Sequence, residues 1–139
     1  MKIYRRVAAL AIMTTLSGIA GGAEIIGAGP AEFEGRCAVC HGLQGRGDGP
    51  FAALLLRPPA DLTRLAIANG GSFPAQRVRR TIDGREAVAS HGPREMPIWG
   101  RELLVEYRRS SVGIGDPETY VRTRIEALVD HLRGLQQAP

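Results

Sequence analysis

The stretch that decides the fold is Cys37-Ala38-Val39-Cys40-His41, which holds both cysteines of the 139-residue chain. Two thiols separated by two residues and followed at once by an imidazole suit three kinds of site. They could form a redox-active dithiol pair, part of a zinc site, or the attachment point of a covalent haem. The rest of the sequence distinguishes between these three interpretations.

Haem attachment is the interpretation that uses all three side chains. The two thiols add across the vinyl groups on one edge of a porphyrin, and the adjacent histidine reaches the iron from one face. A dithiol site needs no histidine at that position. A zinc site needs four ligands, and besides this trio the chain offers only His91 and His131. The motif therefore predicts one covalently attached haem c, tethered by Cys37 and Cys40, with His41 as an iron ligand.

The N-terminal stretch has the three-part pattern of an export signal. Basic side chains come first, an uncharged and mostly apolar run follows at 7–20, and Gly21-Gly22-Ala23 offers small residues for cleavage before Glu24. The apolar run is shorter than the roughly 20 residues that a membrane-spanning helix needs, so cleavage is favoured over an uncleaved membrane anchor. We expect a signal peptide at 1–23, one domain at 24–139, and a soluble protein in a bacterial periplasm.

The charge pattern argues against a nucleic-acid partner. The net charge of the chain is +4, but the expected signal contributes three positive side chains and no acidic one, which leaves the mature part near +1. No dense basic stretch is interleaved with aromatic residues, as nucleic-acid binding requires. Two arginine pairs, Arg79-Arg80 and Arg108-Arg109, could steer an acidic redox partner or be ordinary solvated surface.

The chain is organised as short helical segments separated by Gly/Pro loops, and no segment shows strand alternation. A helix is predicted over 74–83, with Ser72 as its cap and Gly84 as its stop. The last helix has the clearest pattern, because Asp116 can cap it and Pro117 suits its first position. Its apolar stripe has spacings of three and four and consists of Val121, Ile125, Leu128, Val129, Leu132 and Leu135. These patterns predict an all-α protein.

Met96 is the candidate for the sixth coordination position of the iron. It is the only methionine after the expected signal, and it lies in Met96-Pro97-Ile98-Trp99-Gly100, where proline and glycine favour a rigid loop. A Met/His pair raises the potential of a haem. Two alternatives remain: Met96 could fill the core, or His91 could be the distal ligand. His131 is expected to pack on the last helix.

The chain resembles the class I, monohaem, His/Met-ligated c-type cytochromes of bacteria. The attachment motif and the Met96 loop carry most of the resemblance. It extends over Gly29 and Phe33, CAVCHG at 37–42, Gly45 to Pro50, PPADLT at 58–63, MPIWG at 96–100 and IEALVDHLRGLQ at 125–136. The resemblance implies a small, all-α, cytochrome c-like haem domain whose N- and C-terminal helices cross. Gly29 and Phe33 would then lie against Leu128 and Leu132.

The resemblance also implies how the haem is held. A backbone carbonyl, commonly that of a proline, fixes the proximal imidazole, which points to Pro58 or Pro59; the alternative is that this pair only ends a helix. Trp99 could donate to a haem propionate or be a core tryptophan. Residues 101–115 exceed the usual link to the last helix and have no role assigned from the sequence.

The function implied is electron transfer by Fe3+/Fe2+ cycling, without enzymatic activity. The implied partners are redox proteins such as a dehydrogenase or a membrane oxidase or reductase complex. Membrane contact would come only through those partners or through an uncleaved signal anchor. Two other classes stay open: a haem subunit of a dehydrogenase or oxidase complex, and a haem peroxidase or gas sensor in which Met96 is displaceable.

Overall fold

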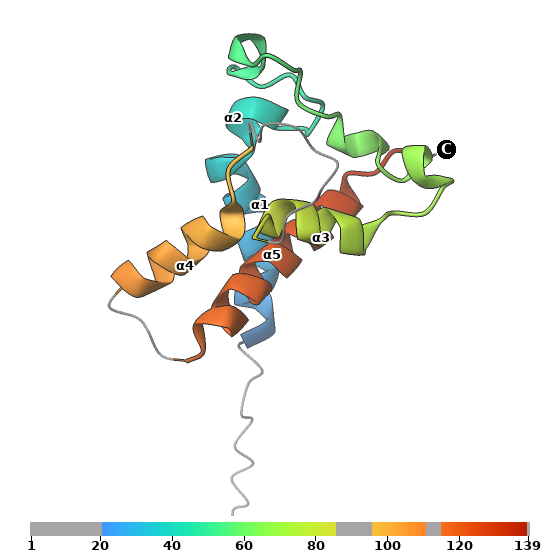
Figure 1. Ribbon diagram of the computed structural model, residues 1–139. Coiled ribbons are helices and arrows are strands. Elements are labelled where there is room, and N and C mark those ends of the chain that lie inside the picture. The colour runs from blue at the N-terminus through green and yellow to red at the C-terminus, as the bar shows by residue number, and fades with distance from the viewer. Residues whose placement is uncertain (1–20, 86–95, 111–114, 139) are drawn as a thin grey trace, which may run out of the picture.

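The computed structural model describes residues 21–85, 96–110 and 115–138, with only the backbone described for 21–27. The regular elements of these residues are all helices and include no strand, which confirms the predicted all-α class. None of their helices is long and apolar enough to cross a membrane. Figure 1 shows the elements, which are α1 (Gly21–Arg36), α2 (Ala38–His41), η1 (Ala52–Leu54), η2 (Leu62–Arg64), η3 (Ile67–Asn69), α3 (Ala75–Asp83), α4 (Trp99–Arg109) and α5 (Pro117–Gly134).

Helix α5 is the centre of the fold, and α1, α3 and α4 all pack against it. It begins as the sequence predicts. The carboxylate of Asp116 accepts a hydrogen bond from the backbone N–H of Thr119 at 2.8 Å, and Pro117 occupies the first turn. The predicted apolar stripe is buried except for Leu135, which is half-buried, and Ala127 is buried with it. Burial of this stripe is the main stabilising contribution that α5 makes.

Helix α1 crosses α5 at Gly29, where the two backbones come into close contact. A Cβ atom on Gly29 would lie only 2.3 Å from the carbonyl oxygen of Ala127. One turn later, Phe33 is 2% exposed and its ring lies 5.0 Å from that of His131, centroid to centroid. His131 therefore packs in the α1–α5 interface, and the absence of a side chain at Gly29 sets how closely the helices approach.

A network of ion pairs ties α1 to α4 and α5. Glu32 on α1 is only 7% exposed, and its carboxylate pairs with Arg36, at 2.7 Å, and with Arg124 of α5. Glu106 of α4 pairs with Arg36 as well, and it accepts a hydrogen bond from the hydroxyl of Tyr120 at 3.0 Å. A buried carboxylate is stable only when it is paired. The network therefore fixes the end of α1, directly before the attachment motif.

Helix α3 ends as predicted but begins differently. Gly84 closes it in the left-handed conformation, with its N–H donating to the carbonyl of Arg80. The N-terminal residue is capped by no side chain, because Pro74 and not Ser72 occupies the cap position. The Ser72 carbonyl instead accepts a hydrogen bond from the Asn69 side-chain amide at 2.8 Å, within the preceding turn.

The glycine-rich segment after α2 folds back onto the attachment motif. The backbone N–H of Gly47 donates to the carbonyl of His41 at 2.8 Å, and that of Gly49 donates to Cys40 at 3.0 Å. Near the end of the chain, the side chain of Gln136 fixes the segment 62–66, because it donates to the Leu62 carbonyl and accepts from the Ala66 N–H. These contacts fix the loops that surround the motif.

Residues 101–109 of the segment 101–115, which had no role assigned from the sequence, belong to α4, and 111–114 lie outside the described residues. Leu103 is 1% exposed and belongs to the core that α5 organises. The role of this segment is therefore to add a third helix to the packing around α5.

Candidate functional site

A cavity of about 420 Å³ lies beside the attachment motif, between the end of α1, α2, α3 and the segment leading into α4. This volume is within the range of about 300–1,000 Å³ typical of small-molecule and cofactor sites. Its walls are mainly aliphatic and aromatic. Every site residue predicted from the sequence lines it, namely Cys37, Cys40, His41, Pro58, Pro59, Met96 and Trp99.

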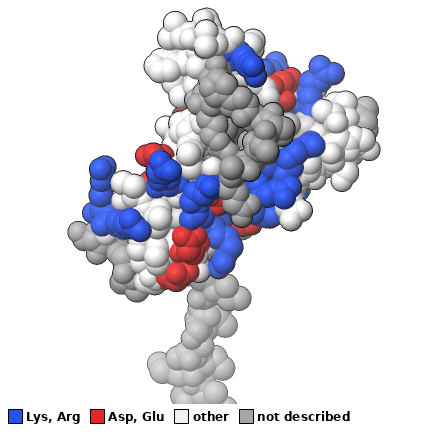
Figure 2. Space-filling model, in the orientation of Figure 1, with Lys and Arg blue, Asp and Glu red and all other residues white. Residues whose placement is uncertain are grey.

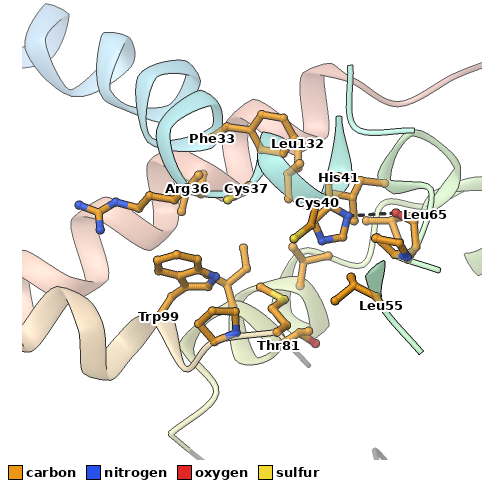
Figure 3. A pocket seen from close by; sticks show the side chains of 18 of the residues that line it. Phe33, Arg36, Cys37, Cys40, His41, Leu55, Leu65, Thr81, Trp99 and Leu132 are labelled. Carbon is orange, nitrogen blue, oxygen red and sulfur yellow. Dashed lines mark hydrogen bonds between the residues drawn. The ribbon is translucent and has the colours of Figure 1, made fainter. Parts of the chain in front are cut away.

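Helical geometry brings the three side chains of the motif to one face. The N–H of Cys37 donates to Phe33, and the N–H of His41 donates to Cys37, each at 2.8 Å, so the backbone continues in helical turns through the motif. Positions 37, 40 and 41 are three and four residues apart and therefore neighbours on a helix. Figure 3 shows Cys37, Cys40 and His41 around the same cavity.

The Cys37 thiol does not have the electrostatics of a dithiol oxidoreductase. Both thiols of the motif are free and half-buried. Burial raises the pKa of the Cys37 thiol to about 11, although the neighbouring charge of Arg36 opposes this effect. Redox-active Cys-x-x-Cys pairs depend on a thiol pKa lowered below its usual value. The site therefore does not favour the dithiol interpretation.

The imidazole of His41 is fixed through one of its two nitrogens. Its Nδ1 atom lies 3.1 Å from the backbone carbonyl oxygen of Ala60, drawn as the dashed line in Figure 3. With Nδ1 donating this bond, Nε2 keeps its lone pair for a metal ion. Burial lowers the pKa of His41, and the bond to Ala60 opposes this only in part. The ring is therefore neutral near pH 7, which is the form that binds a metal.

The carbonyl that orients His41 corrects the prediction made from the sequence. It belongs to Ala60 and not to Pro58 or Pro59. The carbonyl of Pro59 is directed elsewhere, since a Cβ atom on Gly47 would lie 2.5 Å from its oxygen. The two prolines line the cavity, and the next carbonyl along the chain is the one that meets the imidazole.

Met96 and Trp99 reach the cavity from the segment that leads into α4. Met96 is half-buried and packs against the core, and Trp99 is the first residue of α4. The guanidinium of Arg36 lies 5.8 Å from the centroid of the Trp99 ring. Figure 3 shows Trp99 on a different side of the cavity from His41. His91, the rival distal ligand, lies outside the described residues.

Three arginines at the cavity were missed by the sequence reasoning: Arg36, Arg57 and Arg77. Among the described residues that line the cavity there is no aspartate or glutamate. Guanidinium groups form charge-assisted hydrogen bonds with carboxylates. An apolar cavity with arginines in its lining therefore suits a large apolar ring that carries carboxylate groups. A local signal existed for Arg36, which directly precedes the motif, but only tertiary structure places Arg77 here.

The side chains around the cavity were tested against the group that the motif implies. The described part of the chain contains no group of three or more histidine, cysteine, aspartate or glutamate side chains placed to hold a metal ion. Two thiols, one oriented imidazole and one thioether around an apolar cavity fit a covalently tethered haem c.

Comparison with known proteins supplies no relative from which a function could be transferred. No protein-family model, curated protein or solved structure matches the chain. The function must therefore be argued from the chemistry of the site.

Proposed function

We propose that the chain is a monohaem c-type cytochrome that transfers electrons. Cys37 and Cys40 tether the haem, His41 is the proximal ligand and Met96 the distal one. The observation that carries the proposal is a single apolar cavity lined by all four side chains, although Met96 is far from the motif in sequence. When bound, the haem supplies one-electron exchange between ferric and ferrous iron.

We propose the cytochrome c-like fold on the same basis. In that fold the N- and C-terminal helices cross beside the haem. The close approach of α1 to α5 at Gly29 supports this assignment, as does the position of Phe33 and Leu132, which belong to the helix interface and also line the cavity.

The described lining of the cavity is sufficient for an electron carrier. Outer-sphere electron transfer needs an apolar cavity that holds the haem and a ligand set for the iron, and it needs no proton-transferring group. Cys37, Cys40, His41 and Met96 line one apolar cavity, and these side chains would hold the haem and its iron.

The proposed partners are other exported redox proteins, such as a dehydrogenase or a membrane oxidase or reductase complex. Figure 2 shows arginine side chains over α3 and α4 on the face drawn. Arg79 is paired with Glu126 of α5, while Arg80, Arg108 and Arg109 are exposed. These exposed side chains could attract an acidic partner. The alternative, a haem subunit of a larger complex, predicts co-purifying subunits and a native mass above that of the single chain.

Covalent attachment is tested with protein produced alongside a cytochrome maturation system. We expect a haem-stained band in denaturing electrophoresis, because thioether bonds survive denaturation. Cys37→Ala and Cys40→Ala should each weaken or abolish that band. Removal of the haem from the wild-type protein by acid–organic extraction would overturn the proposal. The intact mass of the exported protein shows whether residues 1–23 are removed.

The distal ligand is tested by Met96→Ala in the holoprotein. The substitution should open the sixth position, remove the weak red-edge absorption of sulfur–iron ligation, lower the reduction potential and permit fast binding of carbon monoxide or imidazole. The control is His91→Ala, which should leave that absorption unchanged. If His91→Ala removes the ligation signature and Met96→Ala keeps a closed low-spin site, Met96 is the wrong ligand.

A further inference from the structure

The end of α3 and the start of α5 are joined by one cluster of charged side chains, which packs against the start of α4. The guanidinium of Arg85 binds both carboxylate oxygens of Asp83, at 2.7 and 2.9 Å, and both carboxylate oxygens of Glu118, at 2.8 and 2.9 Å. We call Asp83, Arg85 and Glu118 the Arg85 clamp. Asp83 is the last residue of α3, and Glu118 lies in the first turn of α5.

The Arg85 clamp packs directly on Gly100 in the first turn of α4. A Cβ atom on Gly100 would lie 2.3 Å from the Oδ1 atom of Asp83 and 2.6 Å from the Nε atom of Arg85. Any larger residue at position 100 would force the carboxylate or the guanidinium aside. The side chain of Arg85 and the backbone of Gly100 are therefore in close packing contact, although 15 positions separate them in the sequence.

Met96 lies in the sequence between Arg85 and Gly100, the two residues that meet in this contact. From Gly100 back toward Met96 the backbone is ordered by the helix start, because the carbonyl of Ile98 accepts hydrogen bonds from the N–H groups of Arg101 and Glu102. Pro97 then restricts the backbone between Ile98 and Met96. The position of the Met96 thioether therefore depends on a short and conformationally restricted stretch of backbone that ends at Gly100.

We propose that Arg85 is a positioning residue that holds Met96 in place as the distal iron ligand. This inference rests on the proposed function. Bringing the ends of a chain segment together costs conformational entropy. Where the fold already brings those ends together, formation of the sulfur–iron bond does not require this loss of conformational entropy. Without the clamp, Met96 would compete less well with an external ligand for the iron.

The geometry of the Arg85 clamp makes its contribution to holding Met96 larger than that of an ordinary surface ion pair. Exposed single pairs contribute little to stability. Here one guanidinium pairs with Asp83 through two nitrogens, a bidentate geometry that is stronger and more directional, and the same guanidinium also pairs with Glu118 through its Nη1 atom. Arg85 is 32% exposed and Asp83 27% exposed, so solvent screens the pair only partly.

The test is a titration of the ferric holoprotein with imidazole, in which binding is monitored by the loss of the sulfur–iron absorption. Arg85→Gln should tighten apparent imidazole binding about tenfold, which corresponds to about 1.4 kcal/mol. Arg85→Lys keeps the charge but loses the bidentate geometry, so it should lie between Arg85→Gln and the wild type. The matched control is Arg79→Gln, which breaks the Arg79–Glu126 pair between the same two helices, α3 and α5, at side chains 37% and 38% exposed. This control should leave imidazole binding unchanged.

A second variant keeps the test decisive if Arg85→Gln does not fold. Glu118 is 56% exposed, and Glu118→Gln should tighten imidazole binding by roughly two- to threefold, because one of the two pairs remains. Wild-type imidazole binding in both Arg85→Gln and Glu118→Gln would overturn the inference, and so would an equal change in Arg79→Gln. Met96→Ala distinguishes a failure of this inference from a failure of the proposed function. If it has no effect on imidazole binding, the proposed function itself fails.

Discussion

Replacing Gly29 by alanine should destabilise the protein, although alanine is the better helix former. In a helix interior, glycine costs about 0.5–1 kcal/mol relative to alanine. At the α1–α5 crossing, however, the new Cβ atom would lie 2.3 Å from the carbonyl oxygen of Ala127, 2.9 Å from its carbonyl carbon and 3.2 Å from Cβ of His131. Optimal contacts between carbon atoms are near 3.5–4.0 Å. The two helices would have to separate by about 1 Å to restore such contacts.

This separation would disturb the most extensive helix–helix interface among the described residues. Overpacking of this kind costs about 1–3 kcal/mol. After the gain in helix propensity is subtracted, the free energy of unfolding should fall by about 1–2 kcal/mol. For a domain of this size the melting temperature should fall by roughly 4–8 °C. Urea unfolding followed by far-UV circular dichroism measures both the sign and the size of the change.

Gly35 provides the control, because the same substitution in the same helix should have the opposite sign. It is exposed, and a Cβ atom there would meet nothing within 4 Å. Gly35→Ala should therefore raise the free energy of unfolding by about 0.5–1 kcal/mol. If Gly29→Ala stabilises the protein as much as Gly35→Ala does, α1 and α5 do not cross at Gly29 as described.

Two further changes test the charges buried between the helices. Glu32→Gln leaves Arg36 and Arg124 without their shared carboxylate and should lower the free energy of unfolding in urea by about 2 kcal/mol. The control Glu34→Gln, at an exposed position two residues later, should change it by less than about 0.5 kcal/mol. Equal effects of the two substitutions would contradict the ion network. Burial lowers the pKa of His131 below its usual value, so the unfolded chain takes up the proton first as the pH falls. The contribution of His131 should thus be fully present above pH ~6.5 and be lost on acidification below that value. His131→Phe should remove this part of the pH dependence between pH 7.5 and 5, and an unchanged slope would show that His131 is not buried against Phe33.

Several features of the site were accessible from the sequence because they depend on local geometry. Cys37, Cys40 and His41 lie within one and a half turns of helix, so their spacing alone places them on one face. The start of α5 was predicted correctly because a capping aspartate and a proline act within a single turn. The apolar stripe of α5 follows from helical periodicity and identifies the face that the other helices cover.

Other features depend on segments that meet only in the folded chain. The carbonyl that holds His41 belongs to Ala60, because the bend of the loop and not the presence of a proline decides which oxygen faces the ring. Arg57 and Arg77 reach the cavity from separate segments, and nothing in their neighbouring residues indicates this. The ends of the Met96 segment meet through the Arg85 clamp, which no spacing rule predicts.

The sequence by itself determined the helical class, the placing of Cys37, Cys40 and His41 on one face, and the last helix, because short-range spacing and backbone preference act within a few residues. The tertiary structure decided that Met96 and Trp99 line the same cavity as His41, that α1 meets α5 at Gly29 and that arginines line the cavity. These arrangements depend on how side chains from distant segments fill a common volume. Such packing is a property of the whole chain, since each contact exists only when the others have formed.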